Sequence, residues 1–292
     1  GLTWTFTLRK GVRFHHGRQK ETLAAYHVAP DLFAASALEP WVGVHRDLGA
    51  WILRTLHAHG HLAKRTTAQF YDARRQIFLN GRQVQGRCPI QGCKSEKAYA
   101  DECSLGHQYE PRNLIAPRSM LSDEPPEMRD VTNWYLDLPA LRPQLEAWVR
   151  GLREALWRPS TVSAIEEYLE PPVLHITKDQ AEKLGEVAGE LPRHRQQEGQ
   201  AKSLQLVFDA LEDREKAQEI LGRHAIRSRA GKTLVPFRLT GNLEWGLPAP
   251  ELEGLAGLTF WVWPESLWAP ISFTASVLEG APRAAATWRD WW

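Results

Sequence analysis

Apolar residues recur with helical spacing in three parts of the chain. The first part covers residues 47–59, is followed by Gly60 as a stop signal, and places apolar side chains at Leu48, Trp51, Ile52, Thr55 and Leu56. The second part contains Leu145, Trp148, Val149, Leu152, Ala155 and Leu156. The third part contains Leu204, Val207, Phe208, Leu211 and Ile220. This spacing gives a helix one buried face, so the pattern predicts three amphipathic helices.

Shorter signals fill the intervals between these helices. Thr177 and Gln180 form a T-x-x-Q capping box, which predicts a helix of about three turns. Residues 188–202 are polar and predict a solvated linker, and residues 110–139 are rich in proline and predict a loop.

Strand signals are found near both ends of the chain and before the cysteine residues. Residues 1–20 alternate apolar and polar side chains and predict a strand that turns at Lys10-Gly11. Residues 69–87 predict short strands, with the hairpin-type dipeptide Asn80-Gly81. The apolar run LTFWVW at 258–263 is typical of a buried strand in a parallel α/β sheet. Together these elements predict the α/β class.

Composition limits the function classes that fit. The 292 residues are 43% hydrophobic and 24% charged, which is typical of a soluble globular chain. The net charge of +1 means that any nucleic-acid contact must come from a local basic patch. No apolar run is long enough to cross a bilayer, and no secretory segment is recognisable. We therefore expect a cytoplasmic protein without a membrane partner.

The three cysteine residues are clustered between residues 88 and 103. They form the pattern Cys88-x4-Cys93, followed nine residues later by Cys103-x3-His107. Three thiolates and one imidazole can close a tetrahedron around Zn²⁺, and their odd number and close spacing argue against a disulfide framework. A closed shell of four ligands leaves no position for water, which predicts a structural zinc site, with Tyr99 and Tyr109 available to cover it.

Other charged groups give weaker signals. A basic run without acidic residues extends from 223 to 238 and is equally compatible with a phosphate-binding patch and a solvated loop; its members are Arg223, Arg227, Arg229, Lys232 and Arg238. His57, His59 and His61 alternate near a helix end and are interpreted as surface or capping groups.

Three stretches in order resemble the connective insertion of methionyl-tRNA synthetase, a class I aminoacyl-tRNA synthetase. They are GHLAKRTTAQFYDARRQIFLNGRQVQGRCP, CPIQGCKSEKAYADECSLGHQYEP and LIAPRSMLSDEPPEMRDVTNWYLDLP. The later run LTGNLEWGLPAPELEGLAGLTFWVWPESLWAPISF and the final WRDWW resemble the return into that family's catalytic Rossmann fold. The first twenty residues instead resemble a segment of the peptide-binding proteins of ABC transporters.

The resemblance implies a division of the chain into four parts. These are an N-terminal segment of open origin at 1–35, a connective insertion at 36–140 with its zinc knuckle at about 76–120, a helical extension at 141–235, and a returning part of the Rossmann domain at 236–292.

The resemblance also implies the residues of the site. The family's knuckle uses two C-x2-C pairs, whereas here the first pair is wider and His107 replaces the last cysteine. Trp263 matches the tryptophan of the family's methionine pocket, and a flat indole suits a thioether. Pro270 stands where the pocket has a tyrosine, and Gly241 and Asn242 replace an Arg-Asp pair.

Two elements that handle ATP in the family have no good match here. Phe14-His15-His16-Gly17-Arg18 is at most a degenerate form of the His-Ile-Gly-His element, and no Lys-Met-Ser-Lys-Ser loop is found. We therefore expect no catalytic residue in this chain, which would be an incomplete fragment that forms no adenylate by itself.

The function implied by the resemblance is that of a methionine–tRNA ligase. Such an enzyme activates methionine with ATP and Mg²⁺ and transfers it to tRNA(Met). An alternative hypothesis is a zinc-dependent RNA-binding module, derived from the insertion, that has no catalytic activity. A solute-binding protein, suggested by residues 1–20 alone, is a third and weaker hypothesis.

Overall fold

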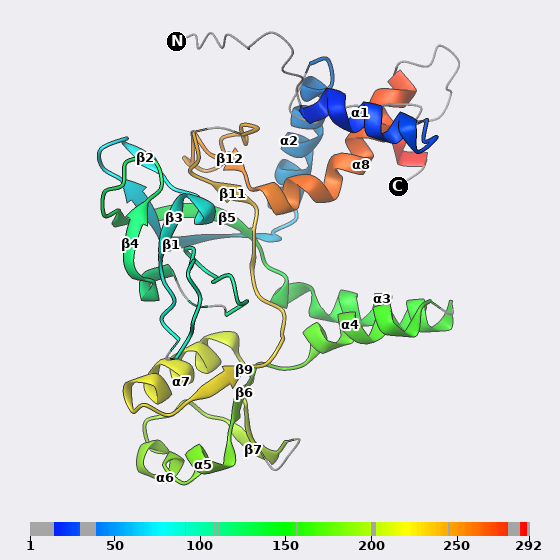
Figure 1. The fold of residues 1–292 in the computed structure, drawn as a ribbon. Helices are drawn as coiled ribbons and strands as arrows, with labels where there is room; N and C mark the ends of the chain where they lie inside the picture. The colour runs from blue at the N-terminus through cyan, green and yellow to red at the C-terminus, as the bar shows by residue number, and fades with distance from the viewer. Residues whose placement is uncertain are drawn as a thin grey trace. The chain divides into compact units, whose positions relative to one another are not determined.

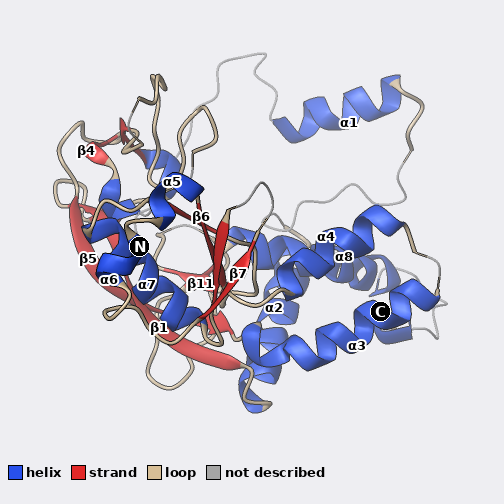
Figure 2. Cartoon of the chain, turned by 90° about the horizontal axis from the view of Figure 1, so that it is seen from below, coloured by secondary structure: helices blue, strands red, loops and turns tan. Residues whose placement is uncertain are grey.

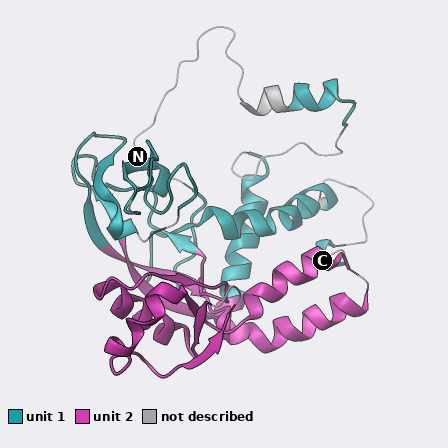
Figure 3. Cartoon of the chain, turned by 60° about the horizontal axis from the view of Figure 1, so that its bottom comes forward, with its two compact units in different colours: residues 1–55, 69–129, 240–292 teal, residues 56–68, 130–239 magenta. Residues whose placement is uncertain are grey.

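The computed structural model describes most of the chain. The described residues are 15–29, 39–90, 92–107, 109, 111–155, 157–199, 203–244, 246–279 and 287–290. They form two compact units (Figure 3), of which unit 1 combines residues 1–55, 69–129 and 240–292 and unit 2 combines residues 56–68 and 130–239. None of the helices in the described ranges is long and apolar enough to cross a membrane.

Two long helices form the helical part of unit 1, together with the shorter α1 (His15–Ala25). Helix α2 (Val42–Ala58) buries His45, Leu48, Gly49 and Leu53, and Gly60 follows it with φ of 72°. The predicted helix is thus confirmed, although it begins five residues earlier than expected. Helix α8 (Val262–Glu279) contains Pro270. It follows the short antiparallel pair of β11 (Thr240–Gly241) and β12 (Thr259–Phe260).

A four-stranded sheet has the strand order β10-β5-β1-β2, of which Figure 1 labels β5, β1 and β2. It consists of β1 (Leu62–Asp72), β2 (Ile77–Phe78), β5 (Glu127–Leu136) and β10 (Phe237–Arg238). The loop predicted at 110–139 is therefore wrong over most of its length. Strand β5 buries Val131, Asn133, Trp134 and Tyr135, and its β-forming side chains outweigh the nearby prolines.

A second small sheet of unit 1 pairs β3 (Val84–Arg87) with β4 (Ile115–Ser119). The single-turn helix η1 (Gly81–Gln83) precedes it, and η2 (Pro111–Asn113) lies between its strands. Asn80 caps η1 through a complete capping box with Gln83. The hairpin turn predicted at Asn80-Gly81 is therefore wrong, because the Asn80 side chain accepts two backbone N–H groups and starts a helical turn instead.

Unit 2 contains a helical hairpin and a second four-stranded sheet. Helices α3 (Arg142–Glu154) and α4 (Pro159–Leu169) pack together through Val149, Leu152 and Val162, and η3 (Pro139–Leu141) precedes them. The helix predicted near residue 145 is thus confirmed. Arg153 and Glu166 form an exposed bidentate ion pair between the two helices.

The second sheet belongs to a βαββαβ subdomain, which we define as residues 173–230. It contains β6 (Val173–Ile176), α5 (Lys178–Ala181), α6 (Leu184–Val187), β7 (Arg195–Glu198), β8 (Leu204–Val207), α7 (Leu211–Arg223) and β9 (Ser228–Ala230). All three strand pairs are antiparallel, in the order β7-β8-β6-β9. Its core comprises Leu174, Ile176, Leu184, Val187, Leu206, Phe208, Ala217, Leu221 and Ile226.

This subdomain differs from the sequence prediction in three places. The helix predicted from Leu204 begins only at Leu211, because LQLV alternates and forms β8. The capping box at Thr177 opens two single turns, α5 and α6, where one helix of three turns was predicted. The predicted linker at 188–202 contains the exposed strand β7. Figure 2 shows the resulting mixture of helices and strands, which confirms the α/β class.

Two further predictions concern the ends of the chain. Residues 1–14, where a strand was predicted, lie outside the described residues, and residues 15–20 form part of α1. The strand predicted at 258–263 is limited to Thr259–Phe260, and it pairs antiparallel with β11. Residues from Val262 onward are helical, so Trp263 lies in the first turn of α8.

Candidate metal centre

The central part of the knuckle, residues 81–114 in unit 1, is shaped by tight backbone turns. Gly92 and Gly106 adopt positive φ angles of 79° and 80°, which glycine accepts without a steric cost. The N–H of Cys93 donates to the carbonyl of Ile90, and the N–H of Gly106 donates to that of Cys103. These turns direct the side chains of both ligand pairs inward.

The four predicted ligands converge on one point. The ligand atoms of Cys88, Cys93, Cys103 and His107 all lie within 4.8 Å of one another. The Nδ1 atom of His107 lies 3.3 Å, 3.5 Å and 3.8 Å from the sulfur atoms of Cys93, Cys103 and Cys88. The Sγ atoms of Cys93 and Cys103 are 3.9 Å apart, and all three cysteines are free thiols.

These distances fit a tetrahedral zinc site. Zn–S bonds of about 2.3 Å and Zn–N bonds of about 2.0 Å at tetrahedral angles require about 3.8 Å between two sulfur atoms and about 3.5 Å between sulfur and nitrogen. The three sulfur–nitrogen separations of 3.3–3.8 Å and the Cys93–Cys103 sulfur separation of 3.9 Å lie close to these values, and all four ligand atoms lie within 4.8 Å of one another. Three soft sulfur donors with one imidazole nitrogen are a donor set that Zn²⁺ prefers.

The surroundings of the thiols shift their acidity in opposite directions. Burial raises the pKa of Cys88 above its ordinary value. Burial also raises the pKa of Cys103, but hydrogen bonds from the backbone N–H groups of His107 and Leu105 outweigh it and lower this pKa to about 6. The backbone N–H of Ser95 donates to the sulfur of Cys93 at 3.4 Å. At least one thiolate is therefore available for metal binding at neutral pH.

A small apolar core supports the four ligands. It contains Phe70, Leu79, Val84, Ala98, Ala100, Cys103 and Leu114, with Cys88, Cys93 and Tyr109 packed against it. Tyr109 donates its hydroxyl to the carbonyl of Tyr99 at 2.8 Å, and its burial beside the thiols raises its pKa to about 12. Tyr109 thus covers the cluster as expected, whereas the Tyr99 ring is stacked against the guanidinium of Arg82 at 4.4 Å.

The two residues predicted to bind methionine lie on α8. Trp263 lies in the first turn of α8 and is 69% exposed, and Pro270 lies two turns further along the same helix. The helix does not bury the indole against the described residues of unit 1. A pocket role for these two residues therefore stays a prediction.

The basic run predicted at 223–238 is distributed over several elements. Arg223 ends α7, Arg229 lies on β9, and Arg238 lies on β10. Lys232 forms an ion pair with Glu167. The five side chains therefore do not share one helix or strand.

A Ser–His–Glu cluster that the sequence gave no sign of links α2 to α8 within unit 1. The Nδ1 atom of His45 lies 2.7 Å from the hydroxyl of Ser272, and its Nε2 atom lies 3.2 Å from Glu265. Ser272 is only 1% exposed and donates its hydroxyl to the carbonyl of Ala269. Because a substrate cannot reach this hydroxyl, the cluster is a polar bridge between two helices.

Comparison with known proteins places the chain in a class of enzymes. The sequence profile described as tRNA synthetases class I (M) matches residues 7–182, more than half of the chain. The chain therefore belongs to this family of class I tRNA synthetases. The matched range includes the knuckle and most of the N-terminal segment at 1–35.

Named relatives specify the branch of the class. The methionine–tRNA ligase of Roseiflexus castenholzii is 27% identical over 96% of this chain and 36% of its own length. That of Salinibacter ruber is 31% identical over 53% of this chain and 21% of its own length. The Mycobacterium tuberculosis methionyl-tRNA synthetase in complex with methionyl-adenylate is 11% identical, with a TM-score of 0.38 over 94% of this chain and 35% of that one. The chain thus spans about a third of the length of the ligase from Roseiflexus and of the solved synthetase.

Proposed function

We propose that this chain contributes to the activity of a methionine–tRNA ligase, and that one zinc ion holds its knuckle together. The observation that carries the proposal is the convergence of three thiols and one imidazole within 4.8 Å. That convergence lies inside the range matched by the family profile.

In the proposed reaction the carboxylate of methionine attacks the α-phosphate of ATP, which binds with Mg²⁺, and pyrophosphate leaves. The acyl group of the adenylate then passes to a terminal ribose hydroxyl of tRNA(Met). Catalysis of this kind depends mainly on positioning and on charge stabilisation. The zinc ion has a structural role, since its four protein ligands fix the loops of the knuckle.

The parts of the chain are assigned as the resemblance suggests. Residues 36–140 are the connective insertion with its zinc knuckle at about 76–120, and residues 141–235 extend it. Residues 236–292 belong to the catalytic domain, where Trp263 and Pro270 contact methionine. The origin of residues 1–35 stays open. A metal site that needs three free thiols requires a reducing compartment, which agrees with a cytoplasmic location.

Metal analysis tests the zinc site directly. We expect the purified chain to contain about one zinc ion, and His107→Ala to lower this content, because three thiols leave one position of the tetrahedron unfilled. His59→Ala is the matched control and keeps the zinc content of the parent chain. A parent chain without stoichiometric metal, or with three freely reactive thiols in the native state, would contradict the proposal.

Methionine-dependent exchange between ATP and pyrophosphate separates the ligase from its alternative. The alternative is a zinc-dependent RNA-binding module without catalysis. We expect no exchange above the blank from this chain alone, because two ATP-handling elements of the family have no good match in it. Exchange well above the blank would contradict that expectation and exclude the alternative. Binding of tRNA that is lost with a chelator, together with zero exchange, supports the module.

A further inference from the structure

The sheet of the βαββαβ subdomain has one face covered by helices and one face open. Side chains alternate between the two faces of a strand. Leu174, Ile176 and Leu206 point into the core with α6 and α7. The intervening residues form the open face, and on the four strands they are Val173, His175, Arg195, Gln197, Gln205, Val207 and Arg229.

A row of polar side chains crosses this open face from strand to strand. Gln205 is paired in register with both Gln197 and His175, and His175 is paired with Arg229. The amide of Gln197 donates to the carbonyl of Gln205 at 2.7 Å. The amide of Gln205 lies 3.3 Å from Nδ1 of His175. The row therefore contains one polar side chain from each of the four strands.

The direction of these hydrogen bonds determines the state of the imidazole. Gln205 uses its carbonyl to accept from Gln197, so its amide donates to Nδ1 of His175, and Nε2 carries the proton. Burial lowers the pKa of His175, and the charge of Arg229 lowers it further. His175 is thus a neutral ring that offers a hydrogen-bond donor at neutral pH.

The backbone leaves this donor uncovered. A hollow of about 740 Å³ opens over the face, lined among others by His175, Gln197, Gln205, Arg229 and Gly231. A Cβ atom at Gly231 would lie 2.3 Å from Val173 and 3.2 Å from Nε2 of His175. Glycine at this position therefore keeps the edge of the ring open to a ligand.

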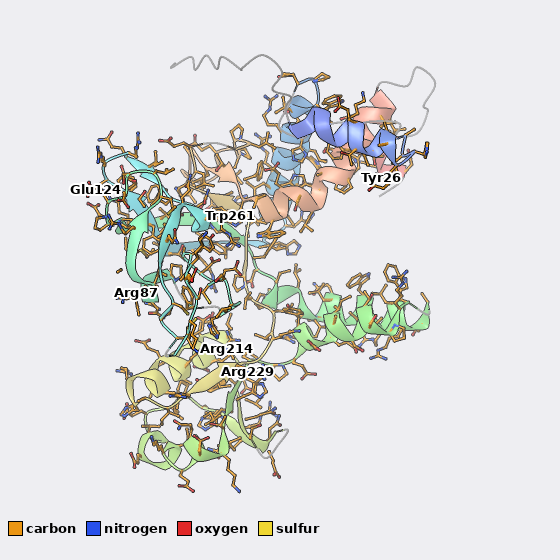
Figure 4. All side chains as sticks on the ribbon, in the orientation of Figure 1. Tyr26, Arg87, Glu124, Arg214, Arg229 and Trp261 are labelled. Carbon is orange, nitrogen blue, oxygen red and sulfur yellow. The ribbon has the colours of Figure 1, made fainter. Side chains whose placement is uncertain are left out.

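Charge on the face has one sign. Arg195 lies on one outer strand and Arg229 on the other, where Figure 4 labels it. None of the strand residues that point to the open face carries a carboxylate. Beyond the strands, the hollow is also lined by two carboxylates, Glu167, which is paired with Lys232, and Glu170. The guanidinium of Arg195 lies 3.9 Å from the carboxylate of Asp209, which is longer than a hydrogen bond.

We propose that this open sheet face binds single-stranded RNA. Amide and imidazole groups match the hydrogen-bonding edges of unpaired bases, a neutral ring can stack on a base, and the two flanking guanidinium groups suit phosphates. A protein partner fits less well, because Val207 is buried and Val173 is the one partly exposed apolar side chain among the strand residues of this face, which also lack the large aromatic anchors of protein interfaces. Four-stranded sheets with one open face are a known platform for single-stranded RNA where rings on the sheet stack on bases, and among the strand residues of this face His175 is the ring available for that contact.

Fluorescence anisotropy with a short, labelled single-stranded RNA of mixed sequence tests the proposal on the full chain. We expect Gln205→Leu and Arg229→Gln each to weaken binding about tenfold, which corresponds to about 1.4 kcal/mol. Arg223→Gln at the end of α7 is the matched control and leaves binding unchanged, since it removes the same charge away from the face. Circular dichroism of each variant verifies the fold.

Salt dependence provides a second readout that a purely structural effect would not change. Two phosphate contacts predict a slope of about −1.4 for log K against log salt with single strands, and Arg229→Gln removes about 0.7 of it. Equal salt slopes for the parent chain and for Arg229→Gln would overturn the proposal. So would the absence of RNA binding, or binding that neither face variant weakens.

This inference does not rest on the zinc site or on the ligase reaction. RNA binding that survives a chelator but is lost in Arg229→Gln supports the sheet face by itself. RNA binding that the chelator abolishes and Arg229→Gln leaves intact assigns it to the knuckle and overturns the inference, while the proposed function stands.

Discussion

Asp72 is a buried carboxylate at the end of β1, with 1% of its surface exposed. It accepts a hydrogen bond from the hydroxyl of Ser119 at 2.5 Å and another from the backbone N–H of Arg75 at 2.9 Å. Burial raises its pKa, but the hydrogen bonds outweigh burial and bring the pKa below its ordinary value. Asp72 thereby ties the turn after β1 to β4, next to the knuckle.

We predict that Asp72→Asn lowers the free energy of unfolding by about 1–3 kcal/mol at pH 7, because buried donors lose a charged acceptor. A depressed pKa contributes stability above the unfolded pKa of about 3.9, and this contribution is lost as the pH falls through the folded value. Urea unfolding at pH 7 and pH 3 checks this. Asp123→Asn, at an exposed position, is the control. A difference between Asp72→Asn and the parent chain that stays constant down to pH 3 would disprove the account.

Gly86 is a second residue whose role depends on its surroundings. A Cβ atom there would lie 2.6 Å from the carbonyl oxygen of Ile115 and 2.9 Å from Leu114. We predict that Gly86→Ala lowers the free energy of unfolding by about 1–3 kcal/mol, since the backbone at Ile115 must move away from the new Cβ atom. Gly151→Ala on α3 meets nothing within 4 Å and should raise stability by up to about 1 kcal/mol. Thermal unfolding of both variants compares them, and equal shifts would contradict the prediction.

At the scale of elements, helices with clear periodicity were predictable, and so were the short strands within residues 69–87, whereas β8 was mistaken for the start of a helix. The pattern in α2 and α3 persists over several turns, so burial of one face determines the helix. LQLV is too short for its period to be distinguished from a helical start, and pairing with β6 decides that it is a strand. LTFWVW is apolar throughout, so its change from strand to helix after Phe260 leaves no periodic signal.

The polar bridge that His45 forms with Ser272 and Glu265 joins two elements, α2 and α8. We predict that His45→Ala lowers the free energy of unfolding by about 1–3 kcal/mol, because Ser272 and Glu265 lose a shared partner in a buried position. Arg46→Ala, on the exposed side of the same helix, should change it by less than about 0.5 kcal/mol. Chemical unfolding followed by tryptophan fluorescence measures both, and equal effects would refute the bridge.

At the scale of the whole molecule, the knuckle and the βαββαβ subdomain have separate cores in different units. We predict that a chelator removes hydrogen-exchange protection from residues 81–114 and leaves the amides of β6 and β8 protected. The physical reason is that the small knuckle core would depend on the proposed zinc ion, whereas the subdomain buries a larger apolar core of its own. Loss of protection in both regions would show that they unfold together.

The sequence by itself was enough to indicate the family and to predict the four candidate metal ligands. Cys88, Cys93, Cys103 and His107 are close in the chain, so short turns suffice to bring them together, and their chemistry is apparent from residue type and spacing. The open face with His175, Gln205 and Arg229 was decided only by the tertiary structure. Those residues are far apart in sequence, and strand register, set by burial of the opposite face, places them in one row.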